Sequence, residues 1–69
     1  METVNRDMIL KSGDKFIYQD EHKVIYTLQK FPDFPLWMLI SELNAMWMEP
    51  MDSPFKAFGG WHQSFAKIG

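Results

Sequence analysis

The stretch KFIYQDEHKVIYTL, residues 15–28, decides the fold. Its two runs, Lys15–Gln19 and Lys23–Leu28, are rich in the β-branched and aromatic residues that favour strands. A polar turn at residues 20–22 joins them, and large apolar side chains recur at alternate positions of each run, as they do along half-buried strands. The pattern predicts an antiparallel hairpin over residues 14–28, onto which the rest of the chain folds back.

The length and composition predict one small, dense domain over residues 1–69, with residues 1–8 as a flexible lead-in. A chain of this length buries only about 60% of the surface that its unfolded form exposes. Three Trp, six Phe, two Tyr and six Met are available for the core, and each aromatic ring buries about 150–250 Å². Two outcomes are open: the core takes up all of this apolar surface, or part of it lies at an interface.

Charge and hydropathy narrow the class of protein. The net charge is −2 with no basic cluster, which disfavours nucleic acid as a partner because its binders carry a basic footprint. The longest apolar run, Leu36–Ile40, is far shorter than the roughly 20 residues of a membrane span. The acidic start lacks the charge pattern of a signal peptide, and there is no cysteine. We therefore expect a cytoplasmic protein that does not bind a membrane.

The middle of the chain is compatible with two structures. Two prolines stiffen Phe31–Pro35, whose aromatic rings either fold over the end of the core or form an exposed hydrophobic finger. After it, Trp37–Ile40 and Ala45–Met48 form a second hairpin around the polar turn SELN. The alternative is a helix at about residues 35–46, but its N-terminal part would be apolar around nearly its whole circumference. We favour the hairpin.

The last third of the chain predicts one helical turn and one strand. Prolines at both ends of Pro50–Pro54 prevent continued strand pairing. A single helical turn can begin at Pro54 and end at Gly59–Gly60, after which Trp61–Ile68 forms the closing strand. The expected fold class is mainly β: a small SH3-like barrel or strongly bent antiparallel sheet of about five strands with one short helical turn. The helix in the middle segment would instead make it α+β.

No catalytic, cofactor or metal motif is present in the sequence. His22 and His62 lack further ligands at metal-binding spacing, and we expect both to be structural or solvated. Asp20 and Glu21 are adjacent in a turn and do not face one another as a catalytic pair of carboxylates would. Gly59–Gly60 lacks the lysine and the strand–loop–helix setting of a phosphate loop. The sequence therefore predicts a protein that is not an enzyme and holds no cofactor.

A resemblance supports the fold class. Trp47–Phe55 is similar to a Trp-x-x-Pro-x-x-x-x-Phe turn of some short uncharacterised bacterial and phage domains. In those domains a Gly-x-aromatic hairpin precedes the turn and an Arg-Phe-x-x-Ile-Gly ending follows it. Gly13–Phe16 and Ser64–Gly69 resemble these two outer pieces, with Ser64 in place of the usual basic residue. The resemblance spans most of the chain and implies an SH3-like small β-barrel, with no chemistry attached.

The aromatic and methionine content is the feature that points to a function. Interfaces favour Trp, Phe and Met, and methionine adapts to irregular partner surfaces. Among Trp37, Trp47, Trp61 and Met46, Met48 and Met51, we expect at least two side chains to be exposed and used in binding. The candidate partner-binding residues are aromatic and lie in the second half of the chain or just before it: Phe31, Phe34, Trp37, Trp47, Phe55, Phe58 and Trp61.

These observations predict a non-enzymatic protein-binding module. Its small size and apolar surface suit an inhibitor, encoded by a phage or mobile element, that blocks a host enzyme or defence complex. One alternative is a self-assembling structural subunit, in which the partner is a second copy of the chain. The other is a small-barrel nucleic-acid-binding protein, which the charge disfavours.

Overall fold

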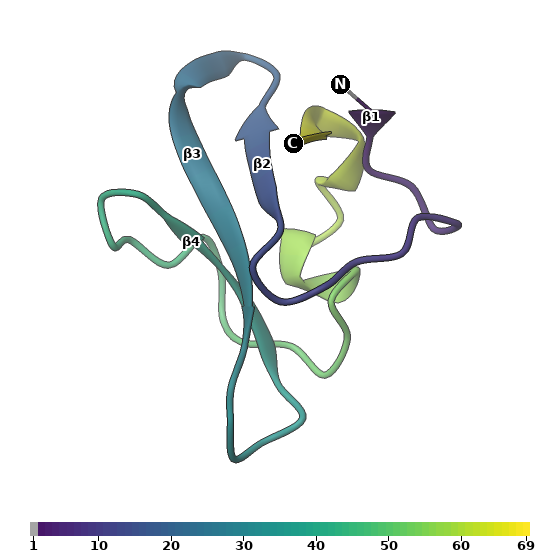
Figure 1. The fold of residues 1–69 in the computed structure, drawn as a ribbon, viewed down its shortest axis with the longest axis vertical. Helices are drawn as coiled ribbons and strands as arrows, with labels where there is room; N and C mark the ends of the chain where they lie inside the picture. The colour runs from purple at the N-terminus through teal and green to yellow at the C-terminus, as the bar shows by residue number, and fades with distance from the viewer. Residues whose placement is uncertain (1) are drawn as a thin grey trace.

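A computed structural model describes residues 2–69, which form one antiparallel sheet of five strands and two single 3₁₀ turns (Figure 1). The order of the strands across the sheet is β1-β5-β2-β3-β4, so the first and last strands of the chain lie side by side. The strands are β1 (Glu2–Thr3), β2 (Lys15–Tyr18), β3 (Glu21–Lys30), β4 (Trp37–Ser41) and β5 (Phe65–Ile68), and the 3₁₀ turns are η1 (Lys56–Phe58) and η2 (His62–Ser64).

The hairpin predicted over residues 14–28 is confirmed as β2 and β3. Phe16 pairs with Tyr26 and Ile17 with Ile25, and the register shifts between Ile17 and Tyr18. The turn is tighter than expected, because Tyr18 pairs with Glu21 and leaves only two residues between the strands. Such a shift sets extra residues of one strand against its partner and increases the local twist of the pair.

The middle segment forms no α-helix among the described residues, so the helix considered at residues 35–46 is wrong. β4 pairs with the second half of β3, from Tyr26 opposite Ser41 to Lys30 opposite Trp37. The second strand expected for this hairpin does not form. The returning chain pairs with β4 only through two isolated bridges, Ile40 with Met46 and Trp37 with Met51. A loop and the ring of Pro50 separate these bridges, and proline has no N–H for a sheet ladder. The second hairpin is therefore partly formed.

The sheet is open and does not close into a barrel. Its two edge strands, β1 and β4, do not pair with each other. The prolines at Pro50 and Pro54 stop the chain from supplying a further strand between them. Instead, η1 contacts β4 and η2 contacts β1, so the two 3₁₀ turns cross the open side of the sheet. The closed SH3-like barrel expected as one form of the fold is thus corrected to an open sheet covered by an irregular segment.

The core lies between the sheet and this irregular segment. Its large, fully buried side chains come from β2, β3, β4, β5, η1 and the segment that follows β1. Val4 is among them, so the residues expected as a lead-in contribute both a strand and a core side chain. The buried cluster is Val4, Phe16, Leu28, Leu39, Ala57, Phe58 and Phe65.

The end of the chain differs from the single strand predicted over residues 61–68. The helical turn η1 is present and ends at Gly59, whose φ of 60° is left-handed, as expected for a glycine that terminates a helical turn. His62–Ser64 then forms the turn η2, and the Ser64 N–H donates to the carbonyl of the preceding Trp61 over 2.8 Å. Only Phe65–Ile68 is a strand, paired with both β2 and β1.

Candidate functional site

The aromatic residues proposed for partner binding divide between the core and the surface. Phe58 is fully buried, with an edge-on contact to Phe16 over 5.1 Å between ring centroids, and is not accessible to a partner. Trp37 is half-buried against the core cluster. Trp47 packs edge-on against Phe65, with ring centroids 5.1 Å apart. These three rings hold the fold together.

The other four aromatic residues lie partly or mainly at the surface. Phe34 is 60% exposed at the tip of the loop between β3 and β4, while Phe31 at the base of that loop is half-buried. The Phe31 N–H donates to the Leu36 carbonyl over 2.8 Å and closes the loop. Trp61 is 54% exposed, and Phe55 is half-buried beside η1. The two rings of the loop therefore differ, with Phe34 exposed and Phe31 half-buried.

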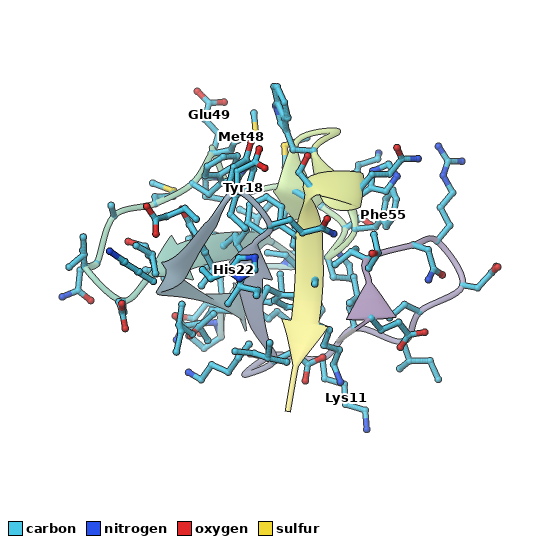
Figure 2. The ribbon with its side chains drawn as sticks, turned by 90° about the horizontal axis from the view of Figure 1, so that it is seen from above. Lys11, Tyr18, His22, Met48, Glu49 and Phe55 are labelled. Carbon is cyan, nitrogen blue, oxygen red and sulfur yellow. The ribbon has the colours of Figure 1, made fainter. Side chains whose placement is uncertain are left out.

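Three methionines add to the exposed apolar surface. Met46, Met48 and Met51 are 52%, 42% and 36% exposed. With Trp61 they confirm that at least two of the six Trp and Met side chains singled out in the sequence are exposed. Met48 and Glu49 lie together at one edge of the molecule, with Lys11 at the opposite edge (Figure 2).

An open pocket of about 720 Å³ lies among Met48, Met51 and the residues around η1. Ligand sites in proteins occupy a similar range of volumes, about 300–1,000 Å³. We call it the Met48 pocket. Its apolar wall consists of Met48, Met51 and Phe55, and its polar and charged wall includes Arg6, Lys56 and His62.

Arg6, Phe55 and His62 form one side of the Met48 pocket. The guanidinium carbon of Arg6 lies 5.6 Å from the centroid of the Phe55 ring, within the range of a cation–π contact. The His62 ring packs on the same phenylalanine at 4.5 Å between centroids. Phe55 thus positions a cation from the N-terminal segment beside a histidine from η2. Phe55 was among the residues expected to bind a partner, whereas Arg6 and His62 were not, because residues this far apart in the chain share no spacing that a motif could reveal.

The floor of the Met48 pocket includes two glycines with left-handed backbone. Gly59 has no room for a side chain, since a Cβ there would collide with the Met48 sulfur. At Gly60 an added Cβ would meet no atom within 4 Å, so the backbone faces open space. The pair therefore lets Met48 lie directly against the chain on one side and leaves the pocket open on the other.

Two buried nitrogen atoms near this region have no hydrogen-bond partner among the described residues: Trp47 Nε1 and His62 Nδ1. An unpaired buried donor or acceptor costs about 1–3 kcal/mol. Trp47 lies within the aromatic cluster and His62 lies at the pocket wall. Both unpaired atoms thus belong to the segment that covers the open side of the sheet, and neither belongs to a strand.

No other known protein supplies a function for this site. Comparison with protein-family models, curated proteins and solved structures found no match to the chain. Within residues 2–69, no group of three His, Cys, Asp or Glu side chains is placed to hold a metal ion, and no helix is long and apolar enough to cross a membrane. The resemblance to short bacterial and phage domains stays a prediction.

Proposed function

We propose that the chain is a non-enzymatic module that binds another protein through the Met48 pocket and its rim. The observation that carries this proposal is the clustering of exposed apolar side chains there: Met48 and Met51 in the wall, and Trp61 next to Gly60 in the chain. A protein of this size gains stability from every apolar side chain that it buries. Apolar side chains left at one surface favour a role in contact with a partner.

A narrower form of the proposal is an inhibitor of a host enzyme or defence complex, encoded by a phage or mobile element. The support for it is the small size of the chain and the exposed methionines that line the Met48 pocket. An inhibitor of this kind acts by covering a surface and needs no cofactor. One enriched host enzyme, inhibited in its own assay by the purified chain, would support this form.

Matched variants test the binding proposal. The tagged protein is used to capture partners from a lysate, beside the variants Trp61→Ala and Leu43→Ala. Leu43 is a suitable control because it is 75% exposed in the turn after β4, whereas Trp61 stands in the chain between two residues that line the Met48 pocket, Gly60 and His62. We expect Trp61→Ala to lose the captured partner and Leu43→Ala to retain it, with unchanged circular dichroism in both. Equal capture by all three proteins would contradict the assignment of this surface.

Self-association is the second candidate, because the same exposed apolar set suits a symmetric contact between copies. The solution mass decides between them: a monomer has 8.2 kDa, and a stable dimer or larger assembly would be a multiple of that value. A multimer that Trp61→Ala or Met48→Ala returns to the monomer would favour self-association. A protein that stays monomeric at all concentrations would rule out self-association and favour binding to a different protein.

A further inference from the structure

We infer that the Met48 pocket takes a partner segment in which an acidic side chain stands next to a large apolar one. This inference rests on the proposed binding function and adds the chemistry of the partner. It follows from the juxtaposition of Arg6 and Lys56 with the apolar wall of Met48, Met51 and Phe55. The sequence singled out Met48, Met51 and Phe55 but gave no sign that Arg6 and Lys56 lie beside them.

The charges that line the Met48 pocket are positive. Arg6 and Lys56 both contribute to its wall, and no carboxylate does. Lys56 is already paired with Asp52 at 3.4 Å, in a bridge whose two side chains are both largely exposed. Arg6 has no carboxylate within ion-pair distance among residues 2–69, and its guanidinium lies over the face of Phe55. The guanidinium is therefore positioned but lacks a counter-ion, and a carboxylate from a partner would supply one.

The apolar part of the Met48 pocket fits a neighbouring large side chain. Met48 and Met51 are flexible thioether side chains that adapt to the shape of a partner, and both are partly exposed. The open space at Gly60 gives a partner's backbone room to approach the floor. A carboxylate on Arg6 and an apolar side chain on the methionines would thus come from adjacent positions of one segment.

The overall charge favours a single acidic side chain over a polyanion. The chain carries a net charge of −2 with no basic cluster, which disfavours a polyanion such as nucleic acid because its binders carry a basic footprint. One carboxylate interacts mainly with charges within a Debye length of about 8 Å, and the charged side chains that line the Met48 pocket itself are Arg6 and Lys56. An acidic–apolar protein segment is the occupant that satisfies both the local and the overall charge.

The test uses two capped peptides, acetyl-Leu-Asp-Phe-Leu-amide and its asparagine analogue. Both are titrated into the full chain, labelled with ¹⁵N and followed by amide chemical shifts. We expect the acidic peptide to shift the amides of Phe55, Gly59, Gly60 and His62, and to bind about two- to fivefold more tightly than the asparagine peptide, the size of an exposed ion pair. The difference should shrink at high salt. Equal binding of both peptides, or shifts confined to other parts of the chain, would overturn the inference.

Three variants assign the effect to particular charges. Arg6→Gln should reduce acidic-peptide affinity to that of the asparagine peptide, and Asp52→Asn should raise it by releasing Lys56 from its bridge. Lys11→Gln is the control, because Lys11 lies at the edge opposite Met48 (Figure 2). A result in which Arg6→Gln and Lys11→Gln act alike would overturn the role of Arg6.

Failure of this inference is distinguishable from failure of the binding proposal. If the acidic peptide shows no preference but Trp61→Ala still abolishes lysate capture, the surface binds a protein of another chemistry and only the acidic–apolar partner is overturned. If Trp61→Ala leaves capture unchanged as well, the surface itself is wrong and both proposals fail.

Discussion

The Met48 side chain lies against Gly59 so closely that a Cβ on the glycine would collide with the thioether sulfur. Gly59 ends η1 with a left-handed φ of 60°, so glycine is favoured there for two separate reasons. One is the backbone conformation, and the other is the space taken by Met48. This contact joins the segment that returns after β4 to η1, the turn that covers the open side of the sheet.

Gly59→Ala should destabilise the protein and move Met48. The left-handed backbone costs about 1–2 kcal/mol once a Cβ is present, and the flexible end of Met48 must swing away. Gly60→Ala is the matched control, because its φ of 84° is also left-handed but its Cβ position is free of neighbours. We expect both variants to lose stability in urea unfolding and only Gly59→Ala to shift the Met48 methyl resonance. An unmoved methyl group in Gly59→Ala would contradict the contact.

Phe65→Ala should unfold the protein or nearly so. The Phe65 ring contacts the rings of Tyr18, Tyr26, Trp47 and Phe58 at centroid distances of 5.1–5.3 Å. Removing such a ring costs about 3–5 kcal/mol, which is a large share of the stability of a small domain.

Phe34→Ala is the matched control, because Phe34 is 60% exposed and surface substitutions usually change stability by less than about 0.5 kcal/mol. Near-ultraviolet circular dichroism and thermal unfolding of the two variants measure the difference. Similar stability of Phe34→Ala and Phe65→Ala would contradict the placement of Phe65 at the centre of the aromatic cluster.

Trp47→Phe should cost little, within about 1 kcal/mol, although Trp47 packs among three other rings. The substitution loses apolar area but also removes the buried Nε1–H that has no acceptor within residues 2–69, and such a group costs about 1–3 kcal/mol. Trp47→Ala loses the packing as well and should cost about 3–5 kcal/mol. Equilibrium unfolding in urea separates the two outcomes. Equal losses in both variants would mean that the N–H is paired in solution.

Ser41→Ala should loosen the turn after β4. Ser41 is buried, and its Oγ accepts hydrogen bonds from the Leu43 and Ala45 N–H groups at 3.3 and 3.2 Å. Because those amides belong to exposed residues that water reaches, the loss should be about 0.5–1.5 kcal/mol. Asn44→Gly should be nearly neutral, since Asn44 has a φ of 63° that glycine adopts freely. Hydrogen exchange at Ala45 measures the opening of the turn, and unchanged protection in Ser41→Ala would rule out this role.

The local sequence pattern was sufficient to predict the first hairpin and the helical turn. The alternation of Phe16 and Tyr18 on one strand and the β-branched run of the next strand specify pairing without help from distant residues, because the period of two places one face inward. Gly59 likewise ends η1 through the left-handed conformation that its backbone adopts freely, although the turn begins at Lys56, two residues after Pro54. The choice of strand over helix after Pro35 was also correct, and for the expected reason: a helix apolar on nearly all sides would have left no polar face.

Local sequence pattern specifies the antiparallel strands and the breaks at the prolines and glycines. The composition supplies a high content of aromatic and methionine side chains. Tertiary packing leaves the sheet open, buries Phe58 and half-buries Trp47 while Met48 and Trp61 remain exposed, and brings Arg6 to Phe55 and His62. The physical reason is the range of the interactions. Strand alternation and backbone conformation act between neighbours in the chain, whereas burial depends on what the irregular segment between β4 and β5 covers when it crosses the sheet. That crossing brings residues more than 40 positions apart to one surface.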